Sequence, residues 1–316
     1  HSGTSSTMKS SAVESDISTR CWLASTPRIP VSSGDIPGFL ERHRGLFTTE
    51  QIRQLNGATV AIAGVGGVGG RVAEVLARSG IGRLKLADPD HFSESNLNRQ
   101  AASTLGNLGE NKAEVVRDAC LAVSPILDVE IFRDGVTPMN LDRFCEGADV
   151  IVDGTDYTIP SLGLMLARRA AAVNTPIVTG VEVAFSAWHT VIQGDGSFER
   201  LFGLPRSVTL EDLDRGRLEI PLWRWITAIP PYVSRAELKR LDAGEIEAPA
   251  IAPAVELSAA MISTDVIRVL LRQRVSVRAP RIHMVDVATG RSSKFRPTKA
   301  RFYASLLPIA IRGGKA

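Results

Sequence analysis

Residues 58–80 read ATVAIAGVGGVGGRVAEVLARSG, and the fold class follows from this stretch. An apolar run rich in β-branched residues meets a cluster of glycines, and an amphipathic segment then closes at Gly80. Gly64, Gly66 and Gly69 have the spacing G-x-G-x-x-G at the turn between this strand and this helix. Glycine lets a backbone approach phosphate closely, and a helix N-terminus presents free N–H groups with a positive dipole. The stretch therefore predicts a nucleotide-binding turn; the alternative is glycine used only for close packing of helix on strand.

Beyond this stretch, strand-like runs alternate with helix-like segments. The runs are apolar at nearly every position, as expected for strands buried on both faces of a parallel sheet. The expected strands comprise residues 83–88, 126–132, 148–154 and 175–180, and the expected helices comprise residues 112–123, 140–147 and 159–173. The predicted fold class is α/β, with a doubly wound, Rossmann-like and mostly parallel sheet.

Three parts are distinguished along the chain. Residues 1–38 are rich in Ser, Thr and Pro and are interpreted as a tag remnant before Met8 followed by a loose N-terminal arm. Residues 39–290 are expected to form the domain, and residues 291–316 a C-terminal extension.

Within the domain, residues 195–250 depart from the alternating pattern. The segment is irregular and too long for a simple connection, so we interpret it as a functional crossover or lid. Before it, residues 184–194 alternate like a strand with one solvent-facing side. After it, a long helix is expected at 252–271 and a strand at 281–287, and TTEQ at 48–51 signals a helix start near the beginning of the domain.

The composition argues against several kinds of partner. The 316 residues include 37 Lys and Arg and 34 Asp and Glu, spread without a basic block, which argues against binding of nucleic acid. No run approaches the roughly 20 apolar residues that span a membrane. The three cysteines, Cys21, Cys120 and Cys145, form no C-x-x-C pair. This usage favours a reducing, cytoplasmic location.

Polar residues follow the second expected strand, where the carboxyl ends of parallel strands form the ligand-binding edge. Asp88 ends this strand, at the position where nucleotide-binding α/β folds have an acid that accepts hydrogen bonds from the ribose hydroxyls. The next residues with amide or basic side chains are Asn96, Asn98, Arg99 and Gln100. A hydride-transfer site has no use for so many phosphate-directed groups, whereas a triphosphate needs its charge held as pyrophosphate leaves.

Three more charged residues belong to the same edge. Lys112 begins a helix and can pair with phosphate, while Asp153 and Asp156 follow a strand, where Asp156 can hold Mg²⁺. Taken singly, the lysine is a solvated side chain and the acids are caps. Their order along the chain favours the functional interpretation.

The order of glycine loop, Asp88, SNLNRQ, Lys112 and DGTDY resembles the ubiquitin-activating-enzyme-like adenylyltransferases, the family of ThiF and MoeB. The resemblance extends from about Arg42 to Val287. It implies that a carboxylate, typically the C-terminus of a small β-grasp protein, attacks the α-phosphate of Mg-ATP to give an acyl-adenylate.

Residue roles follow from this resemblance. It implies that Asp88 holds the ribose, that Asp156 holds magnesium, and that Arg44 or Arg42 of a partner subunit reaches the γ-phosphate in a homodimer. The remaining nucleotide-binding positions are Gly64, Gly66, Gly67, Gly69, Asn96, Asn98, Arg99, Gln100, Lys112 and Asp153.

The sequence departs from the family pattern at three places. Ser197 and Arg200 stand where many relatives have the first of two zinc-binding cysteine pairs, so no zinc site is expected. The crossover segment contains no cysteine nucleophile, and Cys120 and Cys145 are expected in helices as core residues. Tyr157 and Ser161 replace the usual Asn and Arg after the aspartate.

The leading hypothesis is an adenylyltransferase acting on a peptide or small protein with a reactive carboxylate. Its product would be captured without an enzyme cysteine, for amide formation, cyclisation or dehydration, as in relatives that tailor ribosomal peptides. The alternative within the family is activation of a ubiquitin-like or sulfur-carrier protein. An NAD-dependent oxidoreductase is the remote alternative, and a catalytically inactive binding module is disfavoured because every charged member of the phosphate site is present.

The crossover segment leaves two interpretations open. Trp223, Trp225, the stretch IPPY at 229–232 and Arg235 either form an apolar peptide groove with a basic rim or simply pack the segment.

Overall fold

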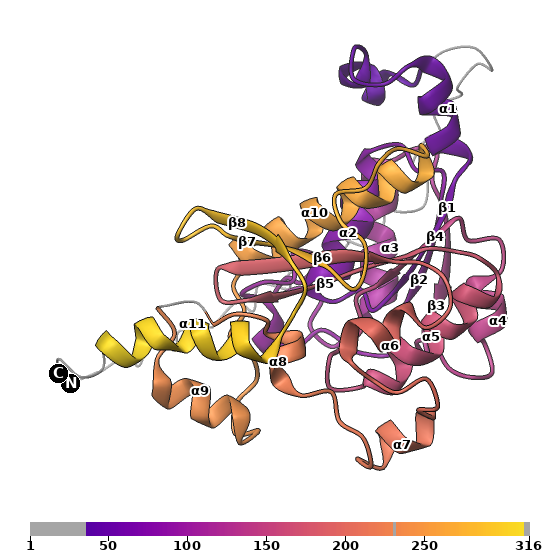
Figure 1. Cartoon of the computed structure of the whole chain (residues 1–316). Helices are drawn as coiled ribbons and strands as arrows, with labels where there is room; N and C mark the ends of the chain where they lie inside the picture. The colour runs from indigo at the N-terminus through magenta and orange to yellow at the C-terminus, as the bar shows by residue number, and fades with distance from the viewer. Residues whose placement is uncertain (1–35, 230–231, 313–316) are drawn as a thin grey trace, which may run out of the picture.

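A computed structural model describes residues 36–229 and 232–312, without the side chains of residues 235, 242 and 306–312. The tag remnant and nearly all of the expected N-terminal arm therefore lie outside the described residues, as do Pro230 and Pro231. The described part is built around one eight-stranded sheet (Figure 1).

The sheet has the order β3-β2-β1-β4-β5-β6-β7-β8. Strands β3, β2, β1, β4 and β5 are parallel, and β6, β7 and β8 continue the sheet in antiparallel pairs. The strands are β1 (Thr59–Ala63), β2 (Arg83–Ala87), β3 (Asp128–Phe132), β4 (Val150–Asp153), β5 (Ile177–Val183), β6 (Ser186–Ile192), β7 (Ile282–Asp286) and β8 (Arg291–Phe295). The predicted fold class is confirmed.

Helices cover both faces of the sheet. The helices are η2 (Gly38–His43), α1 (Thr49–Gly57), α2 (Gly67–Arg78), η3 (Glu94–Asn96), α3 (Lys112–Val123), α4 (Leu141–Cys145), α5 (Pro160–Ala172), α6 (Ser197–Phe202), α7 (Leu210–Asp214), α8 (Leu222–Trp225), α9 (Arg235–Asp242), α10 (Ala252–Leu270) and α11 (Lys299–Arg312). Side chains of α2, α3 and α10 join one buried cluster, and those of α4, α5, α6 and α7 join the other. The sheet is thus covered on two sides, as its apolar strands require.

The glycine turn joins β1 to α2 at very close range. A Cβ on Gly69 would stand 1.8 Å from the carbonyl oxygen of Gly64, so no larger residue fits without movement of backbone. Gly64 itself has φ of +78°, and a Cβ there would approach the carbonyl oxygen of Gly154 to 2.3 Å. Both positions therefore require glycine, one for proximity and one also for its left-handed conformation.

Local signals place the first helix as expected. Thr48 caps α1, since its hydroxyl accepts from the Gln51 N–H at 3.2 Å and the Gln51 side chain accepts from the Thr48 N–H at 2.9 Å. This reciprocal pair satisfies two of the free N–H groups at the helix start.

The prediction that the strand at 184–194 has one solvent-facing side is wrong. All seven residues of β6 are buried. The strand lies inside the sheet between β5 and β7, with α10 against it, while Trp188 and Ile192 join the cluster on the α5 side. In β6, the alternation of small or polar residues with large apolar ones therefore indicates an interior strand that is packed closely on both faces.

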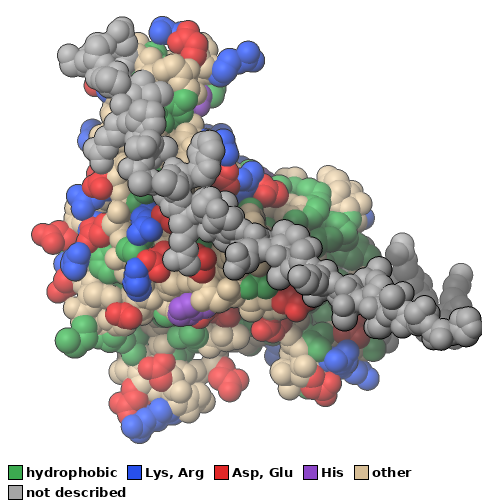
Figure 2. All heavy atoms as spheres, turned by 180° about the vertical axis from the view of Figure 1, so that it is seen from behind, with side chains coloured by type: hydrophobic (Ala, Val, Ile, Leu, Met, Phe, Trp, Pro, Cys, Tyr) green, Lys and Arg blue, Asp and Glu red, His purple; other side chains and the backbone are tan. Residues whose placement is uncertain are grey.

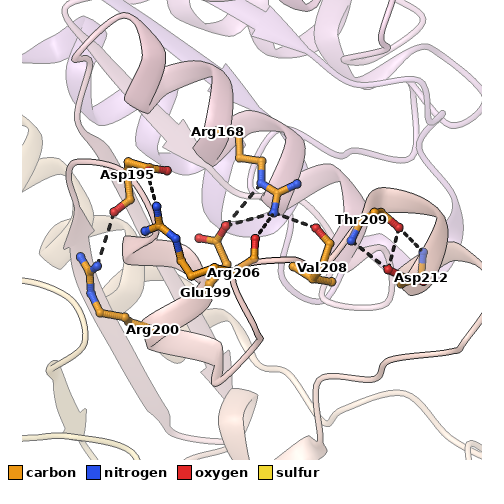
Figure 3. A network of polar contacts seen from close by, with 8 residues as sticks. All are labelled: Arg168, Asp195, Glu199, Arg200, Arg206, Val208, Thr209 and Asp212. Atoms are coloured by element: carbon orange, nitrogen blue, oxygen red, sulfur yellow. Dashed lines mark hydrogen bonds and ion pairs between the residues drawn. The ribbon is translucent and has the colours of Figure 1, made fainter.

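The segment at 195–250 forms the short helices α6 to α9. Side chains of α6 and α7 join the buried cluster that contains α5, and side chains of α8 and α9 join a smaller cluster with Val183 at the end of β5. A polar network fixes its first part (Figure 3). Arg168 of α5 contacts the buried Glu199 of α6 at 3.2 Å and donates to the carbonyl oxygen of Val208 at 2.8 Å. The Arg200 guanidinium donates to the Ser197 hydroxyl at 2.7 Å. Polar contacts thus anchor this part of the segment.

The sheet continues past the boundary expected at residue 290. β8 pairs with β7 in register from Ile282 opposite Phe295 to Asp286 opposite Arg291. Residues 291–295 therefore lie in the same sheet, and α11 follows them.

The visible surface has mixed charge. On the face drawn in Figure 2, Lys and Arg side chains alternate with Asp and Glu rather than forming one basic patch. Within the described residues, no helix combines the length and the apolar character needed to cross a membrane.

Candidate active site

A cavity of about 410 Å³ lies at the carboxyl ends of the parallel strands. Its wall is built by the glycine turn, the end of β2, the loop before α3, the first residue of α3, the loop after β4, the overhanging end of β5 and the last residues before α10. The sequence-predicted residues in the wall are Gly64, Gly66, Gly67, Asp88, Arg99, Gln100, Lys112 and Asp156. Residues far apart in the chain therefore meet around one cavity at this edge of the sheet.

Asp88 connects the glycine turn to the end of β2. One carboxylate oxygen accepts from the Val65 N–H at 2.8 Å, and the other accepts from the Asp90 N–H at 2.9 Å. Burial raises the pKa of the Asp88 carboxyl, and the two backbone hydrogen bonds oppose that shift. The side chain is thus held rigidly in the wall, with lone pairs left for ribose hydroxyls.

Lys112 is the first residue of α3, and Asn111 caps that helix. The Lys112 side chain is buried, and its ammonium contacts the Asp90 carboxylate at 2.9 Å. A buried ammonium beside a cavity is a preorganised cation, because it exchanges its water for fixed partners before any ligand arrives. Its place excludes the interpretation of a merely solvated lysine.

Arg99 and Gln100 reach the wall, whereas Asn96 and Asn98 serve the loop that carries them. The Asn96 side chain accepts from the Ser93 N–H at 3.0 Å and thereby shapes the turn. Asn98 donates to the carbonyl oxygen of Ala250 at 3.2 Å, and the Arg99 guanidinium donates to Asn98 at 2.9 Å. The two asparagines therefore position Arg99 from outside the cavity wall.

The two aspartates after β4 have different environments. Asp156 is exposed in the wall, and one of its oxygens accepts from the Thr158 N–H at 2.8 Å. Asp153 is buried outside the wall, where it accepts from the Thr155 hydroxyl at 2.7 Å and burial raises its pKa. Gly69 likewise lies outside the wall and serves packing.

The N-terminal arginines lie near the amino ends of the parallel strands, at the opposite edge of the sheet from the cavity. Helix α1 leads into the amino end of β1 (Figure 1). Arg44 precedes α1, and its side chain contacts Glu41 at 2.7 Å. The cavity lies at the carboxyl ends, so neither Arg42 nor Arg44 is in the wall of its own chain.

The sequence reasoning missed Glu182 and Glu247 in the wall. Glu182 is a half-buried residue near the end of β5, and burial raises its pKa to about 7. A single acid in the apolar run at 177–183 was the available signal, because an ionisable residue in such a strand needs a reason. Glu247 comes from an irregular stretch with no such signal.

The crossover segment supplies an aromatic side to the cavity. Trp225 lies in the wall, with its ring 4.2 Å from that of Phe202 and 6.2 Å from that of Tyr157, measured between ring centres. Trp223 lies outside the wall and stacks on Arg224 at 4.1 Å. Trp225 thus both packs the segment and faces the cavity; the Arg235 side chain lies outside the described part.

The described cysteines are core residues, as predicted. Cys120 and Cys145 are buried, and burial raises the pKa of their thiols to about 12 and about 11. A buried thiol with a raised pKa is a poor nucleophile. Cys21 lies outside the described residues.

The described residues, 36–229 and 232–312, contain no cluster of three or more potential metal ligands among His, Cys, Asp and Glu. Asp156 nonetheless fits Mg²⁺, which binds through one or two carboxylates together with phosphate oxygens and water.

Two proteins of known name match part of this sequence. The chain is 33% identical over 136 residues to the tRNA threonylcarbamoyladenosine dehydratase of Haemophilus influenzae, covering 43% of this chain and 52% of that protein. It is 29% identical over 164 residues to the maize adenylyltransferase and sulfurtransferase MOCS3-1, covering 51% of this chain and 35% of the relative. The chain thus spans about half or less of the length of these relatives.

Solved structures show the same fold. The crystal structure of PaaA superposes with a TM-score of 0.60 at 18% identity, over 85% of this chain and 76% of PaaA. That of Escherichia coli MccB with MccA-N7isoASN gives a TM-score of 0.58 at 20% identity, over 78% and 66%. The profile of the ThiF family matches residues 40–303, which is most of the chain. The chain therefore belongs to the ThiF family.

Proposed function

We propose that the protein is an ATP-dependent adenylyltransferase that activates a carboxylate of a peptide or small protein. A substrate carboxylate oxygen attacks the α-phosphorus of ATP, the bond from that phosphorus to the bridging oxygen breaks, and pyrophosphate leaves with the bond's electron pair. The products are an acyl-adenylate and pyrophosphate. The observation that carries the proposal is the meeting of Arg99, Lys112 and Asp156 with the glycine turn around one cavity.

Each polar group of the cavity wall has a role that its charge or hydrogen-bonding capacity determines. The glycine turn and the start of α2 offer N–H groups to phosphate oxygens, and Asp88 accepts from the ribose. Lys112 and Arg99 neutralise charge that moves onto the departing pyrophosphate, which is where fixed cations lower the barrier most. For Lys112 this requires a phosphate to displace or share the contact with Asp90.

Magnesium has one fitting residue in this wall. Asp156 would hold it with one oxygen while Thr158 fixes the other, and the ion would neutralise phosphate charge and orient the leaving group. We propose no zinc requirement, because Ser197 and Arg200 bond to each other at the positions of the relatives' first cysteine pair.

A second subunit is part of the proposal. Arg44 lies near the amino end of β1 and the phosphates would lie at the carboxyl ends, so Arg44 can act on the nucleotide only from a partner copy. We therefore infer a homodimer in which this arginine, or Arg42, reaches the γ-phosphate.

The second half-reaction is inferred to need neither of the two thiols that the structure describes. Cys120 and Cys145 are buried away from the cavity wall, so an external or intramolecular nitrogen or oxygen nucleophile captures the adenylate. Amide formation, cyclisation and dehydration all fit this chemistry.

The test is ATP–pyrophosphate exchange with a library of peptides that end in free carboxylates. Exchange by the wild type and its loss in Asp156→Asn support the proposal, because the label returns to ATP only through an adenylate. Glu211→Gln, an exposed acid of α7, is the matched control. Hydride transfer to NAD without any exchange would contradict the proposal.

One alternative is supported by the relatives. A maize relative carries the name adenylyltransferase and sulfurtransferase, which favours activation of a protein C-terminus. Exchange supported by a folded β-grasp protein with a free C-terminal glycine, and not by short peptides, would establish this alternative. Removal of that terminal glycine should then abolish exchange.

A further inference from the structure

The cavity has two chemically different sides. Arg99 and Lys112 belong to the side of the glycine turn, where the phosphates are placed above. The overhanging end of β5 contributes Glu182, and the loop after β4 and helix α8 contribute Tyr157 and Trp225. The phosphate side thus contains both cations of the wall together with Asp88 and Asp90, and the remainder combines Glu182 with aromatic rings.

The backbone fixes Glu182 at this place. The last residue of β5 paired with β4 is Thr179, opposite Asp153, so Glu182 stands on the part of β5 that projects beyond the parallel sheet. The projecting end is held by β6, with Glu182 opposite Ala187, and by the hydrogen bond from the Ala184 N–H to the carbonyl oxygen of Pro249 at 2.6 Å. The side chain is therefore carried by a rigid strand rather than by a mobile loop.

Glu182 has no cation of its own. Arg99 is the cation that acts on it, yet the guanidinium of Arg99 bonds to the carbonyl oxygen of Ser95 at 3.0 Å and to Asn98 at 2.9 Å. Among the described residues, Glu182 forms no ion pair within 4.0 Å. Its pKa is raised to about 7, chiefly by burial and further by the Asp156 carboxylate, so its own backbone hydrogen bond and the charge of Arg99 compensate the ionised form only in part.

A carboxylate in this environment gains most from a bound cation. Pairing restores the solvation that burial removes, and hydrogen bonds to charged groups are about twice as strong as neutral ones. Tyr157 and Trp225 line the same cavity with ring centres 6.2 Å apart, and aromatic rings attract ammonium and guanidinium groups and cover their hydrocarbon stems.

We propose that Glu182 is a specificity residue that selects substrates with an ammonium or guanidinium group close to the carboxylate to be activated. Glu247, on the stretch that runs beside the end of β5, adds a second negative charge to the same side of the cavity. The inference rests on the proposed carboxylate activation and names its substrate class. The cation belongs either to the activated peptide itself or to a separate amine that captures the adenylate.

Matched peptide pools test the proposal by binding as well as by activity. The pools end in a free carboxylate and differ at the preceding residue, which is lysine, arginine, norleucine or glutamate. Calorimetry in the presence of Mg²⁺ and a non-hydrolysable ATP analogue reports binding even if no exchange occurs. The same pools with norleucine plus a separate small amine, ethylamine, distinguish the two sources of the cation.

The wild type should bind the basic pools about tenfold or more tightly than the norleucine pool. Glu182→Gln should remove this preference, and Glu182→Asp should retain part of it, while affinity for the ATP analogue stays unchanged. Equal binding of basic and neutral pools by the wild type, together with no binding of ethylamine beside the norleucine pool, overturns the proposal. So does an unchanged preference in Glu182→Gln.

Two further outcomes separate this inference from the proposed function. A preference for basic pools that depends on Glu182, without pyrophosphate exchange by any pool, refutes the proposed reaction and preserves the charge selectivity. If Glu182→Gln instead changes the Mg²⁺ concentration needed for nucleotide binding, the residue is a metal ligand and the inference fails. Glu211→Gln serves as the control in every arm.

Discussion

The parallel half of the molecule, strands β1 to β5 with their helices, and the crossover half, residues 195–250, differ in how their cavity residues are held in place. In the parallel half, a glycine turn, strand ends and a helix start bring Asp88, Arg99 and Lys112 together by general rules of α/β folds. In the crossover half, Trp225 and Glu247 reach the same cavity from short helices and irregular chain. We propose that the parallel half binds the nucleotide and that the crossover half, together with Glu182 at the end of β5, distinguishes one carboxylate substrate from another.

The largest expected effect concerns the cation of the parallel half. Lys112→Ala should lower adenylation on the order of 10²-fold or more, because it removes a preorganised charge from the departing pyrophosphate. Exchange kinetics measure the loss, and circular dichroism confirms folding. Arg117→Ala, on the same helix but outside the cavity wall, should leave exchange unchanged. Equal losses in both variants would show that only the helix matters.

A second prediction concerns the close contact in the glycine turn. Gly69→Ala should destabilise the protein by about 1–3 kcal/mol or more, since its Cβ would meet the Gly64 carbonyl oxygen at 1.8 Å. Gly57→Ala is the matched control, because nothing lies within 4 Å of a Cβ there. Urea unfolding gives both values, and a neutral Gly69→Ala would mean that the turn is looser than described.

These two sites also show what sequence alone can predict. The strand-turn-helix order and the capped α1 follow from local patterns and are confirmed, while of the polar residues after β2 the structure brings Asp88, Arg99 and Gln100 into the cavity wall and leaves Asn96 and Asn98 outside it. Long-range packing decides the rest. The full burial of β6 depends on neighbours remote in sequence, and the bond from Asn98 to Ala250 joins residues 152 positions apart. Asp153 and Asp156 look alike in sequence, yet only the latter reaches the cavity wall.

A third prediction sharpens the comparison from the crossover side. Trp225→Ala should raise the KM for the activated peptide about tenfold and leave ATP affinity nearly unchanged, because a partly buried tryptophan at a binding surface carries much of the contact energy. Trp223→Ala, outside the wall, is the matched control. Loss of ATP affinity in the Trp225 variant would place this ring at the nucleotide instead.

The smallest expected effect on activity concerns the thiols. Cys120→Ala with Cys145→Ala should leave exchange and product formation intact, because both thiols are buried with raised pKa values. The cost should appear in stability, at about 1–3 kcal/mol for the pair. Pyrophosphate release that continues while product disappears would show that a cysteine carries the acyl group.

The most direct test of the central claim is a calorimetric titration of the wild type and of Lys112→Ala with Mg-ATP and with NADH. The account predicts that the wild type binds Mg-ATP, that Lys112→Ala binds it more weakly, and that neither binds NADH comparably. Tight NADH binding without Mg-ATP binding, unaffected by loss of Lys112, would contradict it.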